Sequence, residues 1–145
     1  MNDRSEGSRP VLSRVRRGVI GVLRSGDELL AIRRAAGIAK GGCWCFPGGH
    51  LEYGETSRMA VVRELREELG IDVEPVRRLG SVRVLDSRHV LAVWEIIQVG
   101  AGQIGGGICP AESEIAEVRW MTANGLREIQ PSLPSNARVL AMLGV

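Results

Sequence analysis

Short apolar runs separated by turn-forming residues dominate the start of the chain. Residues 19–23 and 29–32 are almost entirely apolar, and Ser25-Gly26-Asp27 lies between them. Runs of this length beside a turn signal are typical of buried strands, so the pattern predicts a two-stranded hairpin. A loop is expected over residues 35–42.

The clearest helical pattern in the chain runs from Thr56 to Leu69. Before it, a short strand over residues 44–46 is expected to stop at Pro47-Gly48-Gly49, because proline cannot donate to a strand ladder and glycine frees the backbone. Thr56 suits the N-cap position, and Gly70 stands where helices commonly end. The apolar positions at helical spacing are Val61, Val62, Leu65 and Leu69.

The second half of the chain alternates apolar runs with glycine- or proline-rich breaks. Long strands are expected at residues 73–85 and 89–99, joined at Asp86-Ser87-Arg88. Residues 100–110 hold five glycines and are expected to form a flexible loop. The remaining expected elements are a strand at 118–121, a short helix at 122–129, a break at 131–134 and a closing apolar helix at 136–143.

Length and composition fit one α/β domain. The chain has 145 residues, of which 44% are hydrophobic and 25% charged. We expect the domain to cover residues 15–145, behind a polar, aperiodic and mobile tail over residues 1–14. No run of about 18 apolar residues is present, so no membrane-spanning helix is expected. The start of the chain lacks the pattern of a secretory signal, so the expected location is cytoplasmic.

The charge pattern is ordinary except in one segment. Lys and Arg together number 19 against 17 Asp and Glu, and Lys40 is the only lysine. Aromatic residues make up 3% of the chain, too few for the stacking platforms that bind single-stranded nucleic acid, so no nucleic-acid partner is expected. Residues 49–71 differ, because five glutamates against three arginines give this segment a net charge of −2.

Three carboxylates gather in the predicted helix, because Glu67 and Glu68 follow Glu64 by three and four residues. That spacing places them on one helical face, where like charges repel. One interpretation is a solvated acidic face beside neighbouring arginines. The other is a cation site, because Glu52 and Glu55 precede the helix and a Pro-Gly-Gly turn exposes backbone carbonyls. Oxygen ligands of this kind, combined with substrate phosphates, suit Mg²⁺.

The same segment resembles the Nudix box, G-x5-E-x7-R-E-U-x-E-E-x-G-U, in which U is a bulky aliphatic residue. Residues 49–71 read GHLEYGETSRMAVVRELREELGI and match every fixed position of that motif. The nine matching residues are Gly49, Glu55, Arg63, Glu64, Leu65, Glu67, Glu68, Gly70 and Ile71. Nine residues at fixed spacing form a specific signal, and on it the chain is identified as a member of the Nudix family.

The resemblance implies an α/β/α sandwich with a mixed sheet. It also implies hydrolysis of the pyrophosphate bond of a nucleoside diphosphate linked to another group, with Mg²⁺ or its substitute Mn²⁺ as cofactor. The residues that match the family's metal ligands are Gly48, through its carbonyl, Glu52, Glu64, Glu67 and Glu68. One of the helix carboxylates is also a candidate general base. Arg63 and Glu55 match positions that orient these carboxylates.

The resemblance also implies that a further glutamate, from a loop after the box, can act as a base or a metal ligand, as in relatives. Glu112, Glu114 and Glu117 lie in the corresponding region, and Glu117, three residues before Trp120, is the best placed by sequence. Each of the three is alternatively a solvated loop carboxylate.

Substrate choice is less marked in the sequence. The segment His50-Leu51-Glu52 resembles MutT-like members that act on nucleoside triphosphates, so a (d)NTP is the first expected substrate. ADP-ribose or a nucleotide sugar is the alternative, and Arg33, Arg34 and Tyr53 are candidate contacts for it or for a (d)NTP. A non-catalytic, nucleotide-sensing Nudix domain is the alternative of another class. A monomer or a homodimer is expected, and residues 139–143 are expected to cap the domain's own core rather than an interface.

Overall fold

The computed structural model describes residues 15–84 and 88–145. The expected tail over residues 1–14 and most of the expected turn, Asp86 and Ser87, lie outside the described residues. The elements are β1 (Arg16–Ser25), β2 (Glu28–Arg34), β3 (Trp44–Cys45), β4 (Gly48–His50), α1 (Ser57–Leu69), β5 (Asp72–Arg83), β6 (His89–Val99), β7 (Ile115–Thr122), α2 (Ala123–Glu128) and α3 (Ser135–Leu143).

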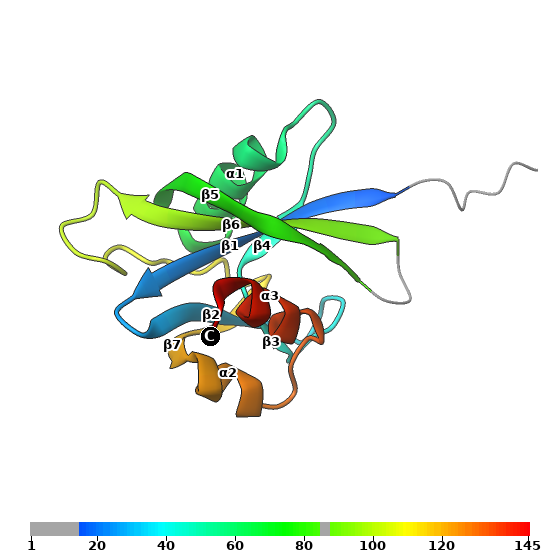
Figure 1. Cartoon of the computed structure of the whole chain (residues 1–145). Coiled ribbons are helices and arrows are strands. Elements are labelled where there is room, and N and C mark those ends of the chain that lie inside the picture. The colour runs from blue at the N-terminus through cyan, green and yellow to red at the C-terminus, as the bar shows by residue number, and fades with distance from the viewer. Residues whose placement is uncertain (1–14, 85–87) are drawn as a thin grey trace, which may run out of the picture.

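The hairpin predicted from the first two apolar runs is confirmed, but its strands soon part. β1 and β2 pair at Arg24 with Leu29 and at Ser25 with Glu28. Beyond this point β1 runs parallel to β6 and antiparallel to β4, while β2 pairs with β3 and β7. β5 extends the sheet beside β6. The result is a mixed sheet in two parts that diverge from the β1–β2 hairpin (Figure 1). One part contains β1, β4, β5 and β6, and the other contains β2, β3 and β7.

β3 ends before Pro47-Gly48-Gly49, as predicted, but the sequence did not predict the strand that follows. Gly48, Gly49 and His50 form β4 and pair with β1, with Gly49 opposite Val19. A Cβ atom on Gly48 would lie 1.9 Å from the carbonyl oxygen of Val19. Glycine is therefore what allows this close approach, and the approach carries the chain from the sheet directly to the start of α1.

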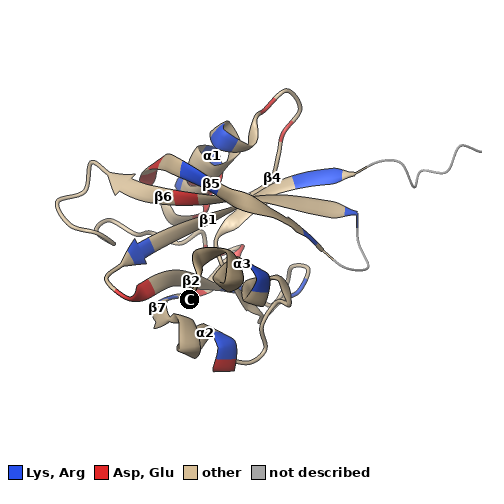
Figure 2. Cartoon of the chain, viewed as in Figure 1, with Lys and Arg blue, Asp and Glu red and all other residues tan. Residues whose placement is uncertain are grey.

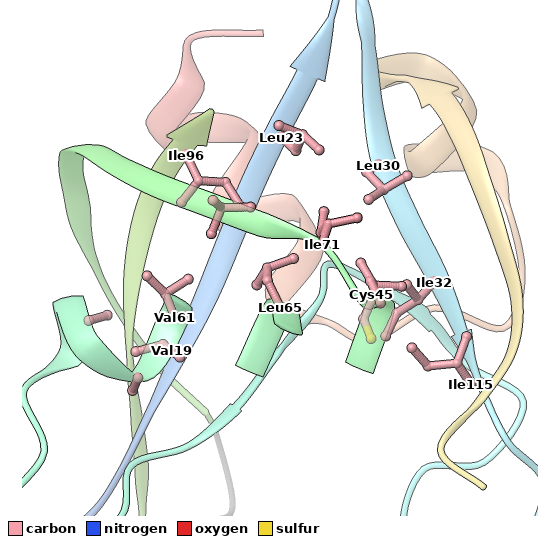
Figure 3. Close-up of a cluster of buried hydrophobic side chains, with 14 residues drawn as sticks. Val19, Leu23, Leu30, Ile32, Cys45, Val61, Leu65, Ile71, Ile96 and Ile115 are labelled. Carbon is pink, nitrogen blue, oxygen red and sulfur yellow. The ribbon is translucent and has the colours of Figure 1, made fainter. Parts of the chain in front are cut away.

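Helices cover both faces of the sheet, α1 on one and α2 with α3 on the other (Figure 1). Alternate residues of β1 serve the two sides: Val19 and Leu23 pack into the cluster beneath α1, and Ile20 and Val22 into the cluster beneath α3. Figure 3 shows the first cluster, in which Leu65 of α1 lies among strand side chains. The expected α/β/α sandwich is confirmed.

The cap residues of α1 are those predicted from sequence. The Thr56 hydroxyl accepts a hydrogen bond from the Met59 amide at 3.2 Å, and Gly70 ends the helix in the left-handed conformation. A Cβ atom on Gly21 of β1 would lie 3.1 Å from side-chain carbons of both Val61 and Leu65. The small residue in the strand lets α1 pack close to the sheet. This packing sets the distance between the sheet and the carboxylates that α1 carries.

The closing helix α3 packs on the domain itself, as expected. Val139 and Leu140 are buried in the second cluster. Among the described residues, no helix combines the length and apolar character needed to cross a membrane.

Candidate active site

Arg63 joins the loop before α1 to the acidic face of the helix. Its guanidinium donates to both carboxylate oxygens of Glu55, at 2.7 and 2.8 Å, and to the carbonyl of His50 at 2.9 Å. The same group donates to Glu64 at 3.1 Å and to Glu67 at 3.0 Å. In Figure 2, acidic positions lie along the loop that enters α1, and basic positions lie on α1 itself.

Arg63 and Glu55 form a strong ion pair in which each group stabilises the charged form of the other. Hydrogen bonds from Arg63 lower the pKa of Glu55 to about 2, and the same bonds raise the pKa of Arg63 above its ordinary value. Glu55 also accepts from the backbone amide of Glu52 at 2.9 Å. The loop between β4 and α1 is thus tied to the helix by a bidentate ion pair.

Glu64 and Glu68 form a buried carboxyl pair one helical turn apart. Glu68 is 5% exposed and the Glu64 side chain 13%. Burial, reinforced by the neighbouring Glu64 carboxylate, raises the pKa of Glu68 well above its usual range, and burial also raises the pKa of Glu64. A hydrogen bond joins the two groups. The mutual repulsion of two carboxylates adds to the effect of burial, so both groups resist ionisation together.

The backbone of β4 forms a cradle around this pair. A Cβ atom on Gly49 would lie 2.4 Å from a carboxylate oxygen of Glu64. The backbone of Gly48 is hydrogen-bonded to Glu68. Two buried carboxylates supply oxygen ligands of the kind that hard divalent cations prefer, and a cation between them would offset their mutual repulsion. The residues therefore fit the Mg²⁺ or Mn²⁺ that the family resemblance implies.

The other two predicted acidic ligands are turned toward Arg63. Glu67 accepts from its guanidinium at 3.0 Å, and Glu52 lies 3.6 Å from it. The side chains of Glu67 and Glu52 are 56% and 66% exposed. Within residues 15–84 and 88–145, no three acidic, histidine or cysteine side chains converge on a common point. The structure thus unites Glu64 and Glu68, with Glu67 and Glu52 as exposed neighbours.

Arg33 and Glu117, both predicted as site residues, pair with each other across β2 and β7. Their side chains lie 3.4 Å apart, and Glu117 also accepts from Arg119. Both arginines lie over the ring of Trp44, which belongs to the cluster beneath α3. The pair is therefore on the opposite face of the sheet from α1. Tyr53 is fully exposed in the loop before α1.

Arg34 and Glu114, ranked lower from sequence, are the groups on the α1 side. Burial raises the pKa of Cys45 to about 12, and its electrostatic neighbours include both Arg34 and Glu68. The charge of Glu114 likewise acts on Glu68. Cys45 and Ile32 belong to the cluster beneath α1. Alternation from Leu30 and Ile32 would also place Arg34 on the helix side, although a register shift lies between Arg33 and Arg34.

Substituting Gly49 by alanine is expected to reduce activity while preserving the fold. The added Cβ atom meets the end of the flexible Glu64 side chain, so the carboxylate is displaced rather than the backbone. We expect kcat/KM to fall by about 10-fold to 100-fold, the usual cost of disturbing the support of a metal ligand. Gly37→Ala is the matched control, because no atom lies within 4 Å of that Cβ position. Equal kinetics in the two variants would contradict the role of Gly49 in positioning the Glu64 carboxylate.

Comparison with known proteins agrees with this geometry. The family model described as NUDIX domain matches residues 12–143. An 8-oxo-dGTP diphosphatase from Escherichia coli is 32% identical over 126 residues, which span 86% of this chain and 92% of the relative. An ADP-ribose pyrophosphatase from Methanocaldococcus jannaschii is 34% identical over 104 residues, spanning 69% of this chain and 60% of the relative.

A solved structure supports the fold independently. The crystal structure of a MutT NUDIX hydrolase from Burkholderia pseudomallei matches with a TM-score of 0.78 and 24% identity, covering 90% of this chain and 99% of that one. The family model, the complete box and the sandwich that carries it on α1 lead to one conclusion. The chain belongs to the Nudix hydrolase family.

Proposed function

We propose that the chain hydrolyses the pyrophosphate bond of a nucleoside diphosphate derivative, with a (d)NTP as the leading substrate and Mg²⁺ or Mn²⁺ as cofactor. The observation that carries this proposal is the buried Glu64–Glu68 pair, hydrogen-bonded under the glycine backbone of β4. Burying two acidic groups together costs stability unless a cation neutralises them. Such a cost is typical of functional sites.

In this proposal Glu64, Glu68 and the Gly48 carbonyl hold the metal, and Glu67 and Glu52 are the candidates to complete its shell. When bound, the metal neutralises the pyrophosphate, lowers the pKa of water and stabilises charge that develops at phosphorus. Arg63 keeps the loop and the helix in register through Glu55. Arg34, on the same side as Glu68, is suited to bind a substrate phosphate.

The reaction itself is a substitution at phosphorus. The oxygen of water forms a new bond to phosphorus, the bridging oxygen leaves, and a carboxylate accepts the proton of the water. Glu67 is the candidate base on the helix, because its side chain is 56% exposed and lies on the same helical face as Glu64 and Glu68. Glu114 is the alternative base from the segment after the box, and Glu117 stays a weaker candidate because Arg33 and Arg119 both engage it.

Support for a (d)NTP substrate comes from the MutT-like segment His50-Leu51-Glu52 and from the relative named 8-oxo-dGTP diphosphatase, which this chain matches over most of both lengths. ADP-ribose is the second candidate, because another relative is named an ADP-ribose pyrophosphatase. The two differ in the group attached to the diphosphate, so a substrate panel separates them.

A panel of canonical and oxidised (d)NTPs, ADP-ribose, nucleotide sugars and dinucleoside polyphosphates with Mg²⁺ tests the proposal. We expect selective cleavage of the (d)NTP class and release of pyrophosphate or phosphate. Selective cleavage of ADP-ribose would replace the substrate but keep the reaction. Nucleotide binding without any cleavage, with Mg²⁺ or Mn²⁺, would favour the sensing alternative instead.

A further inference from the structure

The segment between β6 and β7 is fastened to the C-terminal end of α1. The amide of Cys109 donates to the carbonyl of Leu69 at 2.8 Å, and the amide of Ala111 donates to the carbonyl of Glu68 at 2.8 Å. These carbonyls belong to the last turn of the helix, where no N–H group of the helix itself is available to donate to them. The segment therefore completes α1 at the residue that carries the buried carboxyl group.

One side chain holds the glycine-rich part of this segment. The amide of Gln98, at the end of β6, accepts from the backbone of Gly105 at 2.7 Å and donates to the carbonyl of Gly106 at 2.7 Å. The primary amide thus makes both kinds of hydrogen bond with two consecutive residues, as a neighbouring strand would. Gln98 also lines a shallow hollow of about 350 Å³ between this segment and residues 70–72.

Two features of the structure favour glycine at position 105. Its φ of +85° lies in the left-handed region, and a Cβ atom there would lie 3.3 Å from the ring of Trp120. Side chains other than glycine are strained in that conformation. The Gln98 contact is therefore a specific, closely packed arrangement of the backbone.

The same segment carries Glu114 toward Glu68. The amide of Ala111 donates to the backbone carbonyl of Glu68, as described above. The carbonyl of Ala111 in turn accepts a hydrogen bond from the Glu114 amide at 2.9 Å. The carbonyl of Glu114 in turn accepts from the amide of Ala35 at 2.9 Å, at the end of β2. Glu114 is thus fixed between the end of α1 and the end of β2, close to the proposed metal site.

We propose that Gln98 is a positioning residue that sets the conformation of residues 99–114 and thereby holds Glu114 beside Glu68. The catalytic part of this inference rests on the proposed function. Glycines at positions 100, 102, 105, 106 and 107 give the segment a high conformational entropy when it is not held. Two hydrogen bonds from one rigid strand end remove much of that freedom before substrate binds.

A double-mutant cycle between Gln98→Ala and Glu114→Gln tests the connection. We expect Gln98→Ala to lower kcat by about 10-fold to 100-fold, the usual effect of losing an outer support of a site. Because Gln98 acts through Glu114, adding Gln98→Ala to Glu114→Gln should change kcat by less than about twofold. Gln103→Ala is the control, since the Gln103 side chain makes no hydrogen bond within the described ranges and should leave kcat unchanged.

Two results would overturn the inference: wild-type kcat in Gln98→Ala, or multiplicative losses in the double variant. Gly105→Ala offers a second route to the same change, should Gln98→Ala fail to fold, and it is expected to reproduce the loss of kcat.

Hydrogen exchange separates this inference from the proposed function. In Gln98→Ala the amides of residues 105–111 should exchange at least about tenfold faster than in the wild-type chain, while those of α1 stay protected. Unchanged protection of that segment would refute the role of Gln98 whether or not the protein hydrolyses any nucleotide. Faster exchange in a chain that cleaves no substrate would instead leave Gln98 as a positioning residue and reject the proposed reaction.

Discussion

Glu68→Gln is expected to abolish most hydrolysis while the protein stays folded. The substitution keeps the size of the side chain and its hydrogen bonding but removes the charge that a divalent cation requires. We expect kcat/KM to fall by about 10²-fold or more, the scale of losing a metal ligand or a positioned acid–base group. Glu67→Gln is also expected to lose most activity, because its carboxylate lies on the same helical face. Steady-state kinetics with the best substrate of the panel measures both effects.

A matched control is available on β5. Glu74 is an exposed glutamate outside the site, so Glu74→Gln changes the net charge equally and should leave kcat/KM at the wild-type value. Near wild-type turnover in both Glu67→Gln and Glu68→Gln would overturn the assignment of the helix carboxylates.

The metal-free protein is expected to lose stability as the pH rises, and Mg²⁺ is expected to restore it. The pKa of Glu68 is raised in the folded chain above its ordinary value of 4.5. Above pH 4.5 the native state therefore holds more protons than the unfolded state, so the free energy of unfolding falls with increasing pH. In EDTA, the melting temperature should decrease between about pH 5 and pH 8.

A cation that binds only the folded state adds stability by mass action, and it does so most where the carboxyl pair is deprotonated. The gain in melting temperature on adding Mg²⁺ should thus be larger at pH 8 than at pH 5. Glu68→Gln should flatten both dependences, because its side chain does not titrate. A melting temperature that rises with pH in EDTA, or an equal Mg²⁺ effect in Glu68→Gln, would contradict this account.

The sequence was sufficient for the elements whose signals are local. α1 was predicted within one residue because its apolar spacing, Thr56 cap and Gly70 end all lie within one segment. The β1–β2 hairpin followed from two apolar runs and a turn. In contrast, β4 was not predicted, because its strand character comes only from pairing with β1, over 25 residues away along the chain.

The site was predicted in part for the same reason. Glu64 and Glu68 share a helical face, so their proximity follows from spacing alone. The choice between Arg33 and Arg34 depends on which face of β2 each occupies, and a register shift lies between these two residues. The nearness of Glu114 to Glu68 depends on how the segment after β6 folds back on α1, and no local pattern records that.

The central claim is that the buried Glu64–Glu68 pair is the metal site of a Nudix hydrolase. The most direct test is diffraction from crystals soaked in Mn²⁺, recorded where manganese scatters anomalously. The account predicts an anomalous peak within about 2.5 Å of carboxylate oxygens of both Glu64 and Glu68, and its loss in Glu68→Gln. A peak elsewhere, with these two carboxyl groups still hydrogen-bonded to each other, would contradict it.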